Sequence, residues 1–64
     1  MQQFVFITMN PLILSGKPCI RGTRISVEFI LDLIASGASI ADIVKACPHL
    51  PEIGVKQAIE YATS

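Results

Sequence analysis

The stretch that decides the fold is Gly16-Lys17-Pro18-Cys19-Ile20-Arg21-Gly22-Thr23-Arg24-Ile25-Ser26. It contains two of the four glycines, one of the four prolines and three of the five basic residues of the chain. Short apolar segments precede it, and a helical periodicity of apolar residues begins where it ends. Three roles are open for this stretch: a chemical site, a nucleic-acid contact or a structural hinge.

The residues before this stretch predict a small β element. Residues 4–9 are rich in β-branched and aromatic side chains, and Asn10-Pro11, which is typical of turns, follows them. We therefore expect a short strand over 4–9. Because its apolar run is continuous rather than alternating, we expect cover on both faces, with a second protomer pairing against it. Residues 12–14 and 19–20 flank the turn-forming segment 15–18 and predict a hairpin.

The residues after this stretch predict three helices joined by short connections. Ser26 is placed to cap the first helix, and Gly37 to end it. A capping box over 39–42 begins the second helix, which Pro48 stops. Pro51 is suited to be the first residue of the third helix.

These patterns together predict a mainly α fold, in which the second and third helices have the proportions of a helix-turn-helix. We expect a single domain over 1–64, with the β segment and turn over 1–25 and the three-helix unit over 26–63.

The composition indicates a chain that cannot bury all of its apolar surface. Hydrophobic residues make up 52% of the 64 residues and charged residues 16%, so we expect a homo-oligomer or a bound partner. The residues we expect at that interface are Phe4, Phe6, Phe29 and Leu33. The formal net charge is zero, which argues against strong autonomous DNA binding, although residues 1–24 carry three basic residues and no acidic one.

The sequence contains no convincing catalytic or metal-binding constellation. Cys19 and Cys47 are 28 positions apart, and together with His49 they lack both the fourth ligand and the close pairing of a zinc site. We read the cysteines as partly buried thiols in a reducing cytosol, with a disulfide as the alternative. Gly16-Lys17 lacks the frame of a phosphate-binding loop. We expect no enzyme, no metal, no cofactor, no signal peptide and no membrane span, hence a cytoplasmic protein.

The basic residues are the candidates for nucleic-acid contact. The planar guanidinium groups of Arg21 and Arg24 suit phosphate, but they also suit carboxylates and carbonyl groups within the fold. Lys17 is a candidate for positioning a phosphate. On the third helix, Lys56 and Gln57 are the residues able to reach DNA, although two glutamates on the same helix would repel it.

Several motifs together resemble the domain of unknown function 433 family. The resemblance covers roughly residues 10–62 and rests most on the run GKPxIxGTRI. Its residues are Asn10-Pro11, Gly16-Lys17-Pro18-Cys19-Ile20-Arg21-Gly22-Thr23-Arg24-Ile25, Gly37, Ser39-Ile40, Pro48-His49-Leu50 and Ala58-Ile59-Glu60-Tyr61-Ala62.

The resemblance implies a homeodomain-like helix-turn-helix behind a short β segment, as in VapB-like antitoxins. It further implies an antitoxin of a type II toxin–antitoxin pair, which neutralises a PIN-like ribonuclease toxin and represses its own operon by binding operator DNA. The alternative is a protein–protein interaction module that does not bind DNA. This chain departs from the family pattern at Pro51, where relatives have Ser or Thr, and at Gly54, where they have an acidic residue. We therefore expect the third helix to be frayed at its start.

Overall fold

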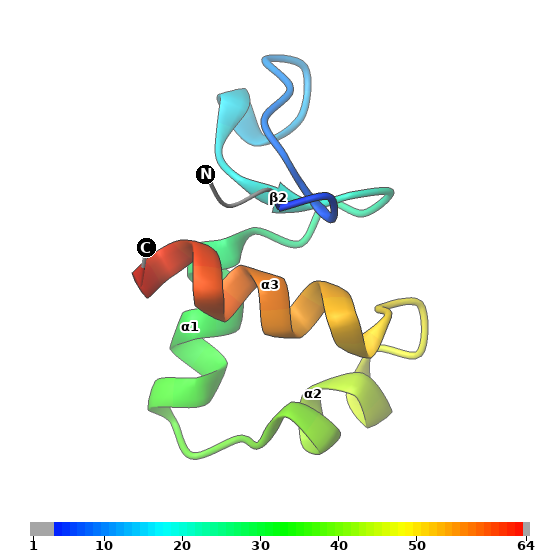
Figure 1. The fold of residues 1–64 in the computed structure, drawn as a ribbon, viewed down its shortest axis with the longest axis vertical. Helices are drawn as coiled ribbons and strands as arrows, with labels where there is room; N and C mark the ends of the chain where they lie inside the picture. The colour runs from blue at the N-terminus through cyan, green and yellow to red at the C-terminus, as the bar shows by residue number, and fades with distance from the viewer. Residues whose placement is uncertain (1–3, 64) are drawn as a thin grey trace.

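Three helices and a two-stranded antiparallel sheet make up the fold (Figure 1). The structure is a computed structural model that describes residues 4–63. The elements in chain order are β1 (Ile7–Thr8), the short 3-10 turn η1 (Leu14–Gly16), β2 (Cys19–Ile20), α1 (Val27–Ala35), α2 (Ile40–Ala46) and α3 (Glu52–Thr63). The expected mainly α architecture with an N-terminal β element is confirmed.

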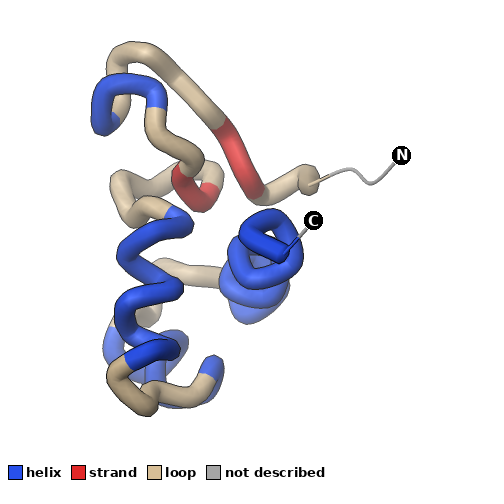
Figure 2. Tube along the Cα trace, turned by 90° about the vertical axis from the view of Figure 1, so that its left-hand side faces the viewer, coloured by secondary structure: helices blue, strands red, loops and turns tan. Residues whose placement is uncertain are grey.

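Helix α3 is the element against which the others pack. It contacts α1, α2 and both strands. In Figure 2 it is seen nearly along its axis, with α1 beside it and the β segment above. The core draws on β2, the three helices and the connection before α3: its members are Ile20, Val27, Ile30, Ile43, Leu50, Val55 and Ala58, none more than 5% exposed.

The decisive stretch folds back on itself before it enters α1. The Ile20 N–H donates to the Ile25 carbonyl at 2.9 Å, and the Val27 N–H donates to the Pro18 carbonyl at 2.9 Å. Gly22 makes the turn between them with a φ of 79°, a conformation that glycine adopts without steric cost. The stretch therefore has a structural role, because it forms the turn that leads into α1.

The predicted helix caps are confirmed. The Ser26 hydroxyl accepts the Phe29 N–H at 3.0 Å at the start of α1. Gly37, with a φ of 103°, follows the last residues of that helix. At the start of α2, the Asp42 N–H donates to the Ser39 hydroxyl at 3.1 Å and the Ser39 N–H donates to the Asp42 carboxylate at 2.9 Å. These hydrogen bonds satisfy backbone groups that a helix leaves without partners at its ends.

The predicted strands were wrong in extent and in pairing. Residues 4–6 form a turn, closed by the Ile7 N–H donating to the Phe4 carbonyl at 3.0 Å, so the strand is shorter than expected. It pairs with β2 in the register Ile7↔Ile20 and Thr8↔Cys19, whereas residues 12–14 pair with neither strand. The physical reason is a tight turn directly after β1, in which Asn10 accepts the Leu12 N–H on its side chain at 2.9 Å.

The expected fraying of α3 at its start was also wrong. Gly54 lies inside the helix and is buried, and its N–H donates to the Pro51 carbonyl at 3.0 Å. A Cβ atom added to Gly54 would lie 3.1 Å from Cγ2 of Ile20 and 3.2 Å from Cγ of Pro51. Glycine at this position therefore allows β2 to approach the helix closely. Pro51, expected inside the helix, instead lies just before it, where its carbonyl is an acceptor for the first turn.

We predict that Gly54→Ala destabilises the domain by about 1 kcal/mol. The added methyl group meets the fully buried Ile20, and overpacking of this kind costs roughly 1–3 kcal/mol. The better helix propensity of alanine offsets up to about 1 kcal/mol of that cost. The midpoint of urea unfolding measures the difference, with Glu60→Ala on the exposed face of α3 as the control. A midpoint equal to or above that of the unmodified chain would show that the packing at Gly54 is not tight.

We further predict that the capping box at α2 weakens in acid. The backbone N–H of Ser39, and after it the Ser39 side chain, hold the pKa of the Asp42 carboxyl below its ordinary value of 3.8. A depressed folded-state pKa means that this stabilisation is complete above pH 3.8 and is lost as the pH falls through the lower folded-state value. The difference in stability between the unmodified chain and Asp42→Asn should therefore shrink between pH 7 and pH 3. The same shrinkage in Asp32→Asn, outside the capping box, would contradict this assignment.

Candidate functional site

The five candidates for nucleic-acid contact lie on different elements of the fold. Lys17 precedes β2, Arg21 follows it, and Arg24 lies just before α1. Lys56 and Gln57 lie on α3. All are exposed except Gln57, which is half-buried.

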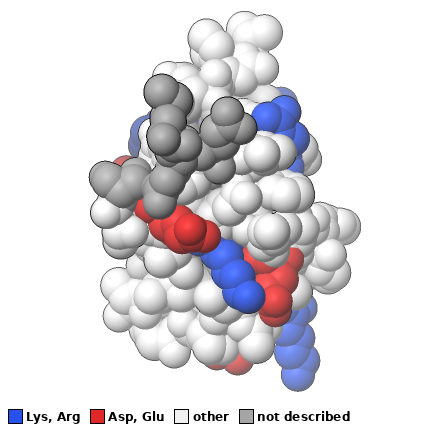
Figure 3. All heavy atoms as spheres, viewed as in Figure 1, with Lys and Arg blue, Asp and Glu red and all other residues white. Residues whose placement is uncertain are grey.

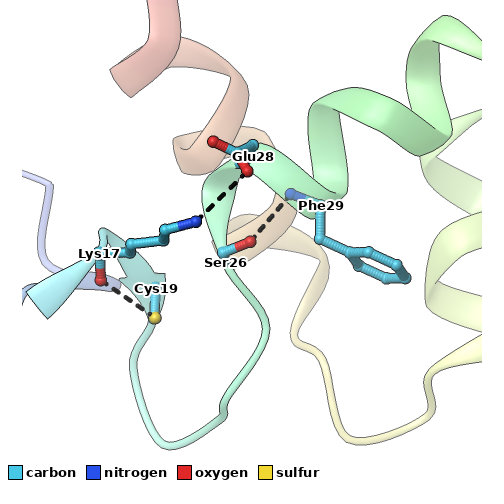
Figure 4. A network of polar contacts seen from close by, with 5 residues as sticks. All are labelled: Lys17, Cys19, Ser26, Glu28 and Phe29. Atoms are coloured by element: carbon cyan, nitrogen blue, oxygen red, sulfur yellow. Dashed lines mark hydrogen bonds and ion pairs between the residues drawn. The ribbon is translucent and has the colours of Figure 1, made fainter. Parts of the chain in front are cut away.

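Both lysines of this group have carboxylate partners. Nζ of Lys17 lies 3.6 Å from Oε1 of Glu28 near the start of α1 (Figure 4). Nζ of Lys56 lies 3.6 Å from Oε2 of Glu52, one helical turn away. All four side chains are more than half exposed, and such ion pairs contribute little to stability. Their effect is local neutralisation of the positive charge.

Arg21 and Gln57 hold the N-terminal segment onto the rest of the fold. Oε1 of Gln57 accepts the Phe6 N–H at 2.9 Å, and Nε of Arg21 donates to the Val5 carbonyl at 2.7 Å. The Arg21 N–H also donates to the Phe6 carbonyl at 2.7 Å. The structural alternative considered for the arginines therefore describes Arg21, and no sequence pattern connects Gln57 with a residue 51 positions earlier.

Arg24 differs from the other four candidates. It is exposed, and within residues 4–63 it makes no hydrogen bond or ion pair. Its guanidinium group is the one in this set whose donors are all available to a ligand.

The exposed face of α3 carries alternating charges. Glu52, Lys56 and Glu60 follow one another at intervals of four residues, which places them in one row along the helix. Figure 3 shows acidic side chains on both sides of a basic one on this face, and the Lys and Arg side chains form no continuous patch there. Two carboxylates in this row would face any phosphate backbone that approached it.

The expected interface residues differ in their exposure. Phe29 is 48% exposed on α1, and its ring points away from the Lys17–Glu28 pair (Figure 4). Phe4 and Phe6 are half-buried, and the Phe4 ring meets the Tyr61 ring edge-on at 5.4 Å between centroids. Leu33 is half-buried and packs against the core. Among these four, Phe29 therefore offers the most surface to a partner.

Sequence reasoning missed the most exposed apolar side chains of the described chain. The loop between the strands, residues 9–18, is called here the hairpin loop. Leu12 is 87% exposed at its tip, Met9 is 61% exposed and Leu14 is 40% exposed; Val5 just before β1 is 58% exposed. The first sixteen residues contain no charged side chain, and this uncharged run is the sequence signal that could have identified the exposed apolar residues.

An apolar cavity of about 300 Å³ lies beside this loop. The segment 17–18, the start of α1 and the end of α3 line it, and Val27, Leu31 and Tyr61 provide apolar walls; the cavity is open to solvent on one side. Lys17 and Glu28, which pair with each other, also line it.

The described residues hold few of the elements of reaction chemistry. No group of three or more His, Cys, Asp or Glu side chains within residues 4–63 is placed to hold a metal ion. Cys19 and Cys47 are both free thiols, and the buried Cys19 donates from Sγ to the Lys17 carbonyl at 3.2 Å. No helix in this part of the chain has the length and apolarity to cross a membrane.

Comparison with known proteins gives a consistent result. The chain is 36% identical over 56 residues to the uncharacterized protein y4eO of Sinorhizobium fredii (strain NBRC 101917 / NGR234). The matched region covers 88% of this chain and 25% of that protein. The fold superposes with a TM-score of 0.85 on the crystal structure of a DUF433 member protein from Anabaena variabilis ATCC 29413, at 26% identity, covering 91% of this chain and 57% of that one. The match to this chain thus spans a quarter of the length of the first relative and somewhat more than half of the length of the second. The family model described as "Protein of unknown function (DUF433)" matches residues 7–62, and the chain belongs to this family.

Proposed function

We propose that this chain is a non-catalytic interaction module of the antitoxin type, which binds a partner protein through its hairpin loop. The observation that carries the proposal is the concentration of exposed apolar side chains there. Leu12, Met9 and Leu14 come from residues 9–16 of this loop, which contain no charged side chain, and Val5 is close by in sequence. Several exposed apolar side chains in one short segment are typical of protein-binding sites, whereas single exposed apolar residues are ordinary.

The backbone of the hairpin loop supports the same proposal. Leu14 and Ser15 have φ angles of 50° and 56°, in the left-handed region that side chains rarely adopt. Each such residue costs roughly 1–2 kcal/mol. Strained conformations of this kind concentrate at functional sites, and here the strain lies in the segment that presents the apolar side chains.

The partner we propose is a PIN-like ribonuclease toxin, in keeping with the family resemblance. An antitoxin neutralises its toxin by binding it and needs no chemistry of its own. A folded domain with exposed apolar side chains in an uncharged segment, here residues 9–16, has a surface suited to such binding.

DNA binding is a second candidate function, and Arg24 favours it. Arg24 is exposed and has no partner in the described chain. It lies between β2 and α1, three positions after Arg21 in the sequence. α2 and α3 follow each other with a five-residue connection, close to the three- or four-residue turn of helix-turn-helix proteins. Because Glu52 and Glu60 flank Lys56 on α3, we propose that contact with DNA is made to phosphate by Arg24 rather than to bases by α3.

We predict that Leu12→Asp abolishes binding of the partner toxin. The measurement is co-purification with the product of the adjacent reading frame, expressed together with the chain. If that product is a ribonuclease that stops growth, the unmodified chain should restore growth and Leu12→Asp should not. The expected loss of affinity is at least tenfold, because a charge replaces the most exposed apolar contact. Ile53→Asp, which alters an equally apolar residue on α3 that is 53% exposed, is the matched control and should retain binding. Equal binding by both variants and the unmodified chain would overturn the proposal.

We also predict that binding to DNA from the chain's own upstream region depends on Arg24. Binding should strengthen as the salt concentration is lowered from 200 to 50 mM, and Arg24→Ala should weaken it and reduce the salt slope by about one phosphate contact. Lys56→Ala should have a smaller effect, because Lys56 is paired with Glu52. Absence of saturable binding at the lower salt concentration would exclude the DNA function.

A further inference from the structure

We propose that the hairpin loop also binds a second copy of this chain, with Leu12 of each copy seated in the apolar cavity of the other. This inference rests on the proposed function in one respect, namely that the hairpin loop is an interaction surface. It adds the identity of a partner and the site that receives the side chain.

The loop presents Leu12 in a defined position. The Leu12 N–H donates to Oδ1 of Asn10 at 2.9 Å, and the Ile13 N–H donates to the Asn10 carbonyl at 2.8 Å. On the other side of the tip, the Gly16 and Lys17 N–H groups donate to the carbonyls of Ile13 and Leu14, both at 3.1 Å. Hydrogen bonds therefore hold the loop on both sides of a side chain that is 87% exposed. A loop ordered before binding loses less conformational entropy when it binds.

The cavity has the size and lining to receive that side chain. Its volume is about 300 Å³, and a buried apolar cavity of about 150 Å³ is known to admit a benzene-sized group. Val27, Leu31 and Tyr61 from α1 and α3 line it. An isobutyl group therefore has room to exchange water for apolar contacts on several sides.

The charges at the cavity favour an uncharged occupant. Lys17 and Glu28 line the cavity and neutralise each other at 3.6 Å. A charged segment would compete with that pair or lose its own hydration, whereas residues 9–16 contain no charge at all. The chain thus carries an occupant whose charge matches the cavity.

The positions of the loop and the cavity suit a two-fold arrangement. The segment 17–18, which lines the cavity, directly follows the loop tip in the chain. The far end of the hairpin loop lies away from the three helices in two perpendicular views (Figures 1 and 2), whereas Met9 and Lys17 at its two ends contact Tyr61 of α3 and Glu28 of α1. In a two-fold dimer the same pair of features is used twice, since each copy donates Leu12 and receives the Leu12 of the other. Such a contact closes on itself and does not propagate into a filament.

The test uses size-exclusion chromatography with light scattering on the full chain from 1 µM to 1 mM. We expect a dimer, twice the chain mass of 6.9 kDa, whose dissociation constant Leu12→Asp raises at least tenfold. Ala62→Trp fills the cavity from an exposed position on α3 and should have the same effect, whereas Ile53→Asp should remain dimeric. An equal mixture of Leu12→Asp and Ala62→Trp should form mixed dimers, because one Leu12 and one open cavity remain. Circular dichroism of each variant verifies folding, and Leu12→Asp alone decides the test should Ala62→Trp fail to fold.

The outcomes separate this inference from the proposed function. A chain that is monomeric at 1 mM, or a dimer unaffected by Leu12→Asp, overturns the inference. If toxin binding is nevertheless lost in Leu12→Asp, the proposed function stands and the hairpin loop serves the foreign partner only. If Leu12→Asp changes neither dimer nor toxin binding, both proposals fail.

Discussion

Ile20 is the residue at which the two layers of this domain meet, and its contact with Gly54 sets the distance between them. Its side chain is fully buried between the sheet and α3, where any residue larger than glycine at position 54 would crowd it. Its backbone is also engaged, because its N–H donates to Ile25 and its carbonyl accepts both the N–H and the hydroxyl of Thr23. One residue therefore fixes the turn that leads into α1 and the seat of the sheet on α3. The close approach favours glycine because a Cβ atom at position 54 would lie only 3.1 Å from Cγ2 of Ile20, which would then have to shift.

The parts of the fold that could be predicted from the sequence are those with local causes. The caps at Ser26, Ser39 and Gly37 depend on residues within three or four positions, so their spacing in the chain is enough to identify them. The pairing of the strands and the contact of Gln57 with Phe6 depend on residues that meet only after folding. The role of Gly54 belongs to the same class, since helix propensity alone predicts a cost and the packing against Ile20 is a tertiary fact.

The same distinction applies to the candidate site. Residue type identifies the arginines and lysines as candidates for binding phosphate, but their availability depends on neighbours that spacing does not reveal. Lys17 and Lys56 are paired with glutamates, and Arg21 is bonded to a carbonyl. Positive charge is thereby neutralised locally at the two lysines, and among the five candidates Arg24 is the one without such a contact within residues 4–63. The apolar hairpin loop is correspondingly the larger feature available for recognition.

The bond between Nε of Arg21 and the Val5 carbonyl has a thermodynamic consequence. Arg21 lies in the turn between β2 and α1, while Val5 lies in the segment just before β1. A ligand that drew the Arg21 guanidinium away would have to overcome this bond, and it would loosen the attachment of that segment to the fold. By linkage, a partner that ordered the segment would in turn weaken the hold of the ligand on Arg21 by the same factor. If both proposed ligands bind, a protein at one end of the β element and an anion at Arg21, this hydrogen bond would make each weaken the binding of the other.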